Sequence, residues 1–407
     1  MKDSGAVLVV DLGFGDGGKG LATDYFARLN AARRVLRFNG GAQAGHNVVL
    51  PDGRHHTFSQ FAAASFLPEV ETVLLEAVVL HPTALLQEAS VLEKKGVRDP
   101  LTRLSVEPNA KITTPFHQAA GRMREKLRSK RHGSCGVGFG ETIRDALHHE
   151  PVRFRDLGDT TDLRRKTRAV QERLRSEMLS TFGQACTFDA EFVFLEDLTL
   201  VDAWVDRCDE VRRRVRTYDR SKQSREEPLV FEGAQGVLID ENFGFAPHTT
   251  WSNCTFHNAE TFLRDIRDER PSARFGVIRS YAVRHGEGPL PSEVRESDLG
   301  ARLRAREKHN VSGTWQGEVR VGAFDVPLFR YALQCVGKLD GLLVTHLDAF
   351  EREIPIATGG DEPLWGPRVQ GETLAKKEFA AMLTREGRTT NLIGSHGPTH
   401  LDVRPMQ

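Results

Sequence analysis

The sequence predicts an α/β protein with a large central, mostly parallel β-sheet flanked by helices. Three observations support this fold class. Short apolar segments alternate with helical patterns, glycine-rich or polar motifs follow several of these segments, and 39% of the 407 residues are hydrophobic, enough for a packed core. We expect one domain over residues 1–407, with a helical excursion at about 150–225 that forms an insertion ending near residue 227.

The first expected element is a strand at Ala6–Leu12, a β-branched apolar run bounded by glycines and typical of a strand buried on both faces. Residues 150–225 are rich in Arg, Glu and Leu at helical spacing. They end in Thr217–Glu227, a charged stretch without apolar periodicity that we interpret as an exposed connection. The other expected strands are Arg34–Phe38, Thr72–Leu80, Pro228–Phe231, Phe275–Val283 and Gly341–Thr345, and the clearest helices are Leu21–Leu29 and Thr83–Lys95.

The charge balance argues against several classes of partner. The 56 Lys+Arg residues equal the 56 Asp+Glu residues, whereas binding to nucleic acid or to an anionic membrane requires a positive surplus. The five cysteines form no C-x-x-C pair, so neither a disulfide framework nor a thiolate zinc site is indicated. No apolar run reaches the ~18–20 residues of a membrane span, and the amino-terminal segment is no signal peptide. We expect a cytoplasmic protein with no nucleic-acid or membrane partner.

The segment Gly13–Gly20, GFGDGGKG, matches the P-loop pattern G-x-x-x-x-G-K-[ST] except at its last position, where Gly20 replaces the hydroxyl residue that ligates Mg²⁺. Asp16 is a carboxylate inside the loop, the ligand type that Mg²⁺ prefers. Five glycines allow backbone N–H groups to surround an anion, and Lys19 adds a point charge. The alternative is a tight strand–helix turn with a surface lysine.

A second glycine motif, Arg37–Val49 (RFNGGAQAGHNVV), also follows an expected strand and contains His46. A histidine beside a phosphate site is suited to general acid catalysis, because its ordinary pKa lies near 6.5. The alternative is a structural histidine.

These motifs and several later ones resemble the adenylosuccinate synthetase family in order and spacing over nearly the whole chain. The resemblance implies a P-loop-related fold and a homodimer that joins L-aspartate to carbon 6 of IMP, with GTP hydrolysis and Mg²⁺. The motifs that carry it are Gly13–Gly20, Gly40–His46, Phe231–Gly236 (FEGAQG), Thr249–Asn253 (TTWSN), Arg284–Pro291 (RHGEGPLP), Thr345–Asp348 (THLD) and Ser395–Pro398 (SHGP).

The resemblance also implies roles for individual residues. Asp16 corresponds to the catalytic base and a metal ligand, His46 to the acid that supports phosphoryl transfer, and Lys19 to the group that neutralises the transferred phosphate. The Gly45 carbonyl would complete the Mg²⁺ shell, and Gln235 would contact the purine near the reacting oxygen. Such a set suits phosphoryl transfer, which depends mostly on positioning and charge neutralisation.

Two binding regions follow from the same resemblance. The substrate nucleotide would be bound by Gln43, Ser134, Cys135, Thr250, His149 and Arg320. GTP would be bound by Gly15, Gly17, Gly18, Lys19, Gly20, His346, Asp348, Ser395 and Gly397. Asp348 would read the N1 and N2 donors of guanine, and His346 stands where the family has a lysine. Asp348 makes GTP our first choice over ATP.

Three features depart from the family. The loop Ser312–Gly322 keeps one arginine, Arg320, where the family has the arginine-rich T-T-G-R-x-R-R, and a guanidinium is the natural receptor for a carboxylate. The segment Gly133–Glu141 (GSCGVGFGE) has Cys135 in place of a threonine, a weaker donor, and His149 lies near the place of an arginine that one family subunit lends its neighbour. Gln43 also replaces an asparagine in this nucleotide pocket. Third, His346 replaces the lysine of the family's T-K-x-D motif.

The sequence is therefore compatible with three functions. The first is a GTP-dependent ligase acting on IMP and L-aspartate. The second is a divergent paralogue that uses another amine donor, or GMP or dGMP as in related phage enzymes, in a specialised pathway. The third, of another class, is a catalytically silent nucleotide sensor. Trp251, inserted in the TTWSN motif, is a candidate for the wall of a pocket.

Overall fold

The computed structural model describes residues 5–128, 133–295, 297–307, 315, 317–359, 364–368 and 371–406. Its main feature is a large sheet in which all neighbouring strands are parallel except β19, which runs antiparallel to β18. The predicted fold class is therefore confirmed. In sheet order the strands are β19 (Val403–Pro405), β18 (Leu392–Ser395), β15 (Gly341–Thr345), β11 (Ser272–Arg279), β1 (Ala6–Asp11), β10 (Leu229–Glu232), β2 (Arg34–Arg37), β5 (Glu71–Leu74), β7 (Leu104–Val106) and β9 (Arg216–Thr217).

Smaller sheets carry the loops around the main sheet. They are β12 (Ala282–His285) with β13 (Val319–Gly322), β14 (Phe324–Asp325) with β16 (Glu353–Ala357) and β17 (Glu372–Ala375), β3 (His46–Val49) with β4 (His55–Phe58), and β6 (Val79–Leu80) with β8 (Lys111–Ile112).

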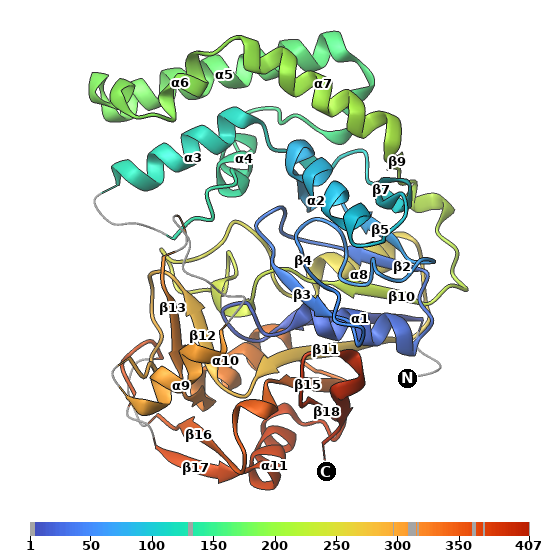
Figure 1. Cartoon of the computed structure of the whole chain (residues 1–407), viewed down its shortest axis with the longest axis vertical. Helices are drawn as coiled ribbons and strands as arrows, with labels where there is room; N and C mark the ends of the chain where they lie inside the picture. The colour runs from blue at the N-terminus through green and yellow to red at the C-terminus, as the bar shows by residue number, and fades with distance from the viewer. Residues whose placement is uncertain are drawn as a thin grey trace.

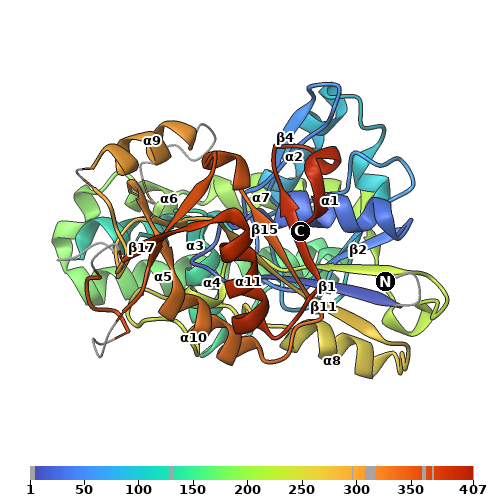
Figure 2. The ribbon, with the colours of Figure 1, turned by 90° about the horizontal axis from the view of Figure 1, so that it is seen from below.

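Helices cover both faces of the sheet and form a separate layer above one end of it (Figures 1 and 2). Helices α1 and α8 lie on opposite faces of β1 and β11 (Figure 2). The helices are α1 (Lys19–Leu29), α2 (Pro82–Lys94), α3 (Pro115–Leu127), α4 (Phe139–Ala146), α5 (Thr160–Phe182), α6 (Phe192–Glu196), α7 (Thr199–Arg214), α8 (His257–Asp265), α9 (Asp298–Arg306), α10 (Val326–Val336) and α11 (Lys376–Gly387). No helix in the described part of the chain is long and apolar enough to cross a membrane.

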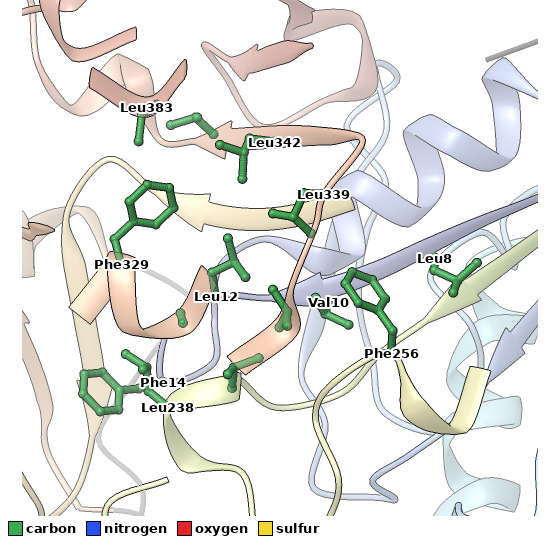
Figure 3. Close-up of a cluster of buried hydrophobic side chains, with 14 of the residues drawn as sticks. Leu8, Val10, Leu12, Phe14, Leu238, Phe256, Phe329, Leu339, Leu342 and Leu383 are labelled. Carbon is green, nitrogen blue, oxygen red and sulfur yellow. The ribbon is translucent and has the colours of Figure 1, made fainter. Parts of the chain in front are cut away.

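Alternation along β1 divides the core between the two faces of the sheet. Leu8, Val10 and Leu12 belong to the larger cluster of buried side chains (Figure 3). Val7 and Val9 point to the other face, in a cluster with residues of α1. Because both faces are buried, the strand appears in the sequence as a continuous apolar run.

The predicted helical excursion is confirmed by α5, α6 and α7, which pack with α3 around a third core cluster (Figure 1). The chain then returns to the sheet through β9, a two-residue edge strand that the sequence does not reveal. The charged stretch Thr217–Glu227 is mostly exposed, as predicted, but side-chain contacts anchor parts of it. Tyr218 is buried and Arg220 pairs with Glu107 at 2.8 Å.

Two predicted strands are wrong as single elements. Thr72–Leu80 divides into β5 and β6, because Val78 N–H bonds the Leu75 carbonyl in a turn between them, and β6 pairs with β8 outside the main sheet. Phe275–Val283 divides into β11 and β12, and β12 leaves the main sheet to pair with β13. An apolar run reports burial but not a change of pairing partner, so these breaks are not visible in the sequence.

Candidate functional site

A cavity of about 250 Å³ lies beside the loops that follow β1, β2 and β10. Ligand sites in open α/β sheets form at this carboxyl edge of the strands. The wall brings together most of the residues predicted for catalysis and for the substrate nucleotide. They are Gly15, Asp16, Lys19, Gln43, Gly45, His46, Ser134, Cys135, Gln235 and Thr250.

The glycine loop is organised around Asp11, the last residue of β1. Its carboxylate accepts hydrogen bonds from Gly13 N at 2.8 Å and Gly17 N at 2.7 Å, and it pairs with Lys19 Nζ at 2.8 Å. A Cβ on Gly17 would lie 2.6 Å from the Asp11 carboxylate, so the loop requires glycine there. Lys19, predicted to neutralise a phosphate, is held by a buried carboxylate in this structure.

Gly20, which occupies the place of the P-loop hydroxyl residue, has a packing role. A Cβ at this position would lie 2.6 Å from the Asn47 carbonyl oxygen. The missing side chain therefore allows α1 to approach β3 closely, and β3 begins with His46. The substitution that departs from the P-loop pattern brings the second glycine motif against the first.

Asp16 has a left-handed backbone, with φ of 56°, and its carboxylate contacts an imidazole. His285 Nε2 lies 2.8 Å from Asp16 Oδ2, and the two side chains are 18% and 30% exposed. Burial alone would raise the pKa of Asp16, but the hydrogen bond from His285, with the charges of Lys19 and Arg279, lowers the pKa to about 2. Asp16 is therefore a charged hydrogen-bond acceptor at neutral pH.

His46 is paired with a residue that the sequence analysis did not select, Glu232 at the end of β10. His46 Nδ1 contacts Glu232 Oε1, and the other carboxylate oxygen accepts the Ala63 N–H at 3.1 Å. Burial lowers the pKa of His46, and Glu232 opposes this shift. An Nδ1–H bonded to the carboxylate leaves Nε2 as the free ring nitrogen, so the pairing fixes the tautomer of His46.

Two side-chain amides, those of Gln43 and Gln235, lie near each other beside Gly40 in the cavity wall. Gln235 has φ of 64° and donates its side-chain N–H to the Thr250 hydroxyl. Gln43 is different, because both its Oε1 and its Nε2 are buried without a hydrogen-bond partner. An unpaired buried amide costs free energy, so Gln43 is suited to a polar ligand that supplies a donor and an acceptor.

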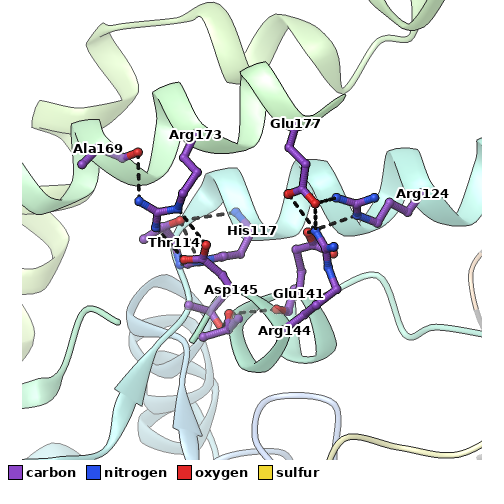
Figure 4. Close-up of polar contacts among 12 residues, drawn as sticks. Thr114, His117, Arg124, Glu141, Arg144, Asp145, Ala169, Arg173 and Glu177 are labelled. Carbon is purple, nitrogen blue, oxygen red and sulfur yellow. Dashed lines mark hydrogen bonds and ion pairs between the residues drawn. The ribbon is translucent and has the colours of Figure 1, made fainter. Parts of the chain in front are cut away.

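The segment that carries Ser134 and Cys135 leads into α4, whose first turn lines the cavity. A charged cluster fixes α4 to α3 and α5 (Figure 4). Arg144 bonds Glu141 at 2.7 Å and Glu177 at 2.8 Å. Arg124 pairs with the same two carboxylates, and Arg173 from α5 binds Asp145 at 2.8 and 2.7 Å. The helical layer therefore positions this wall of the cavity.

The residues predicted to read guanine lie outside the cavity wall, next to the carboxyl ends of β15 and β18. His346 Nδ1 contacts the Thr345 hydroxyl at 2.9 Å, and that hydroxyl donates to the Gly17 carbonyl at 2.7 Å, which joins this region to the glycine loop. Asp348 is exposed and pairs with Arg306. Ser395, also predicted to bind GTP, donates its hydroxyl to the Gly397 carbonyl at 2.7 Å. Gly18, another predicted GTP-binding residue, packs on Thr345.

Two predicted nucleotide-binding residues do not line the cavity. His149 follows α4, and its ring lies beside that of His148. Arg320 in β13 is fully engaged: it binds the Glu293 carboxylate through Nε at 3.0 Å and Nη2 at 2.5 Å, and it donates to the carbonyls of Gly286 and Gly288. Arg320 could reach a substrate only by leaving Glu293.

Sequence reasoning missed Asp11, Glu232 and His285. Asp11 and Glu232 each end an apolar strand just before a glycine motif, Glu232 next to Gly233 and Asp11 two residues before Gly13, and an acidic residue at that position was the available signal. His285 had no such signal, because its contact with Asp16 depends on where β12 leaves the main sheet.

The residues present fit a magnesium ion. The Asp16 carboxylate and the Gly45 backbone line the same cavity, and both supply the oxygen ligands that Mg²⁺ prefers. Within the described ranges no group of three His, Cys, Asp or Glu side chains could hold a metal. Mg²⁺ commonly takes one or two carboxylates together with substrate phosphates and water, so two protein oxygens suffice.

The fold and the cavity together define a nucleotide-binding α/β enzyme in which a glycine loop lies beside the buried pair of His46 and Glu232. A family model for adenylosuccinate synthetase matches residues 8–376, and the chain belongs to this family of C–N ligases of purine biosynthesis. It is 31% identical to the adenylosuccinate synthetase of Rhodococcus erythropolis over 344 residues, which cover 84% of this chain and 77% of the relative. The corresponding protein of Rhodococcus opacus is 31% identical over 359 residues, covering 88% of this chain and 81% of the relative.

Solved structures share the fold. The fully ligated adenylosuccinate synthetase of Plasmodium falciparum superposes with a TM-score of 0.78 at 21% identity, covering 98% of this chain and 99% of the other. A succinoaminodeoxyadenylate synthetase of cyanophage S-2L, bound to dGMP and dATP, superposes with a TM-score of 0.62 at 17% identity, covering 99% and 95%.

Proposed function

We propose that this chain is a GTP- and Mg²⁺-dependent ligase that phosphorylates O6 of IMP, or of a related 6-oxopurine nucleotide, and then couples the product to L-aspartate. We further propose that it works as a cytoplasmic homodimer. The observation that carries the proposal is the presence of Asp16, Lys19, His46 and Gln235 in the wall of one cavity. A nucleotide sensor would need the phosphate loop but not an acid–base pair.

The chain's own groups account for the steps. Ionised Asp16 accepts the N1 proton of the purine, so that O6 can attack the γ-phosphorus of GTP and break its bond to the β-bridging oxygen. His46, held at Nδ1 by Glu232, would act in its protonated form and donate its Nε2–H to an oxygen of the transferred group, and Lys19 would supply positive charge there. Mg²⁺ held by Asp16 and Gly45 would neutralise phosphate charge. The amine then attacks C6, phosphate leaves and the amine loses a proton.

A second candidate differs in the amine donor, and one observation favours it. Arg320, the one arginine of the Ser312–Gly322 loop, is bound to Glu293 through both Nε and Nη2, and its Nη1 donates to backbone carbonyls. A donor other than aspartate, or a nucleotide such as GMP or dGMP, therefore remains an alternative for this cavity.

The test is a matrix of substrates. IMP, GMP and dGMP are each supplied with GTP or ATP and with aspartate or other amino acids, and phosphate release and product mass are measured. We expect release that requires a nucleotide, GTP and an amine together. Asp16→Asn and His46→Ala should lower kcat at least a hundred-fold, whereas Asp52→Asn, a change of an exposed aspartate, should not. Nucleotide binding without release under every condition would leave the sensor as the function.

A further inference from the structure

Trp251 lies in the cavity wall between two residues whose positions are fixed. On one side, Thr250 N–H bonds the Ile239 carbonyl at 2.7 Å. On the other, the Ser252 hydroxyl accepts the side-chain N–H of Asn39 at 3.2 Å. These two hydrogen bonds hold the chain on either side, so the position of the Trp251 backbone is set before any ligand binds.

The indole itself is unusually exposed for a side chain in a concave wall. Trp251 is 44% exposed, although burying an aromatic side chain of this size is strongly favourable. Its pyrrole edge lies along Gly140 in the first turn of α4, where a Cβ would come within 3.0 Å of the Trp251 ring. The absence of a side chain at Gly140 thus gives the indole its place beside the predicted phosphate-binding segment.

The other described tryptophans have different surroundings. Trp204 is buried in the helical layer, and Trp315 has Arg122 and Lys126 over its ring, at 5.3 and 5.5 Å from the centroid. Trp365 is 62% exposed but does not line the cavity. Trp251 therefore combines an exposed aromatic face with a position in the cavity, and Trp365 offers a matched exposed control.

We propose that Trp251 is a binding residue for the substrate nucleotide, with its indole packed against the nucleoside part of the 6-oxopurine nucleotide. This inference rests on the proposed function, because it takes the cavity next to Gln43 and Thr250 as the substrate-nucleotide site. An aromatic platform holds a base by stacking and tolerates different bases, since every base has a π-face. Gln43 and Gln235 would then supply the hydrogen bonds that distinguish one base from another, which stacking alone cannot do.

The test compares Trp251→Phe and Trp251→Ser with Trp365→Ser. We expect Trp251→Ser to raise the KM for the nucleotide substrate roughly ten-fold, the scale of a lost aromatic stack, with the KM for GTP unchanged. Trp251→Phe, which keeps an aromatic face, should raise that KM less than three-fold, and Trp365→Ser should leave it unchanged.

Binding is measured separately from turnover, so that failure of the proposed function can be recognised. IMP should change the tryptophan fluorescence of the wild-type protein, and this change should disappear in Trp251→Phe but persist in Trp365→Ser. Inosine should reproduce part of the change, whereas ribose 5-phosphate should not. An unchanged KM and an unchanged fluorescence response in Trp251→Ser would overturn the proposal, as would a loss of dimer with unchanged nucleotide affinity. A fluorescence response without phosphate release would support this inference while rejecting the ligase.

Discussion

The buried ion pair between Asp11 and Lys19 should make a large contribution to stability. The Lys19 side chain is 3% exposed and that of Asp11 is 0% exposed, and their charged atoms are 2.8 Å apart. Asp11→Asn removes the negative charge and leaves the Lys19 ammonium buried without a counter-ion. Breaking a buried pair in this way costs about 3–5 kcal/mol, because the remaining charge is not solvated.

The loss should be measurable as a shift in melting temperature. For a chain of 407 residues the entropy of unfolding is about 0.85 kcal/mol/K, so Asp11→Asn should lower Tm by about 4–6 °C. Calorimetry and urea unfolding at pH 7 provide the assay. As a control, Asp52→Asn disrupts the surface ion pair between Asp52 and Arg54, whose side chains are 53% and 46% exposed. This change should cost less than about 1 kcal/mol.

The double variant decides whether the pair itself is responsible. Lys19→Met removes the stranded charge, so Asp11→Asn combined with Lys19→Met should be at least ~2 kcal/mol more stable than the sum of the single changes predicts. Strict additivity, or a loss below about 1 kcal/mol for Asp11→Asn, would refute the reasoning. The Asp11 carboxylate would then act on the loop only through its hydrogen bonds to Gly13 and Gly17.

Three further outcomes are expected. Glu232→Gln should lower kcat about ten-fold or more with the KM for GTP unchanged, because His46 loses the negative charge that raises its pKa and stabilises its protonated form; steady-state rates equal to wild type would contradict this. Burial raises the pKa of Asp325 to about 6 despite Arg368. The folded state thus binds the proton of the Asp325 carboxyl more tightly than the unfolded state, so about 3 kcal/mol of stability is lost as pH rises from about 4 through 6. Asp325→Asn should therefore flatten that part of the pH profile of stability, measured by urea unfolding. Arg320→Lys should lower Tm without changing the KM for either substrate, because Lys cannot bind Glu293 bidentately; a raised KM with unchanged Tm would show that Arg320 serves the substrate instead.

The parts of the fold that follow from local pattern were predictable from the sequence. Ala6–Asp11 and Gly341–Thr345 are buried on both faces and therefore appear in the sequence as apolar runs. The helical layer appears in the sequence as charged residues at helical spacing. The division of Phe275–Val283 was not predictable, because β12 turns away to pair with β13 through contacts distant in the sequence. Local pattern reports burial, whereas pairing depends on which segments meet in space.

Prediction of the candidate site was limited in the same way. Asp16, Lys19 and His46 were selected because each lies in a glycine motif that follows a strand, and the structure places all three in one wall. Their partners Asp11 and Glu232 were missed because each is the last residue of a buried apolar strand, where a single acidic residue looks like the end of the pattern. The residues expected at the ligand were thus identified without the carboxylates that orient them.

The pairing of charges near the glycine loop bears on how an anionic ligand enters. Lys19 is bound by Asp11, Arg279 by Glu307, and His285 contacts Asp16. Each of these cationic groups already has a carboxylate beside it, so this end of the cavity does not have a strongly positive electrostatic potential, in keeping with the zero net charge of the chain. A triphosphate would instead be attracted by the backbone N–H groups of the glycine loop and by its own metal ion. In the proposed function, Lys19 would have to turn from Asp11 to bind phosphate, and the affinity would be set by the difference between those two contacts rather than by the full strength of either.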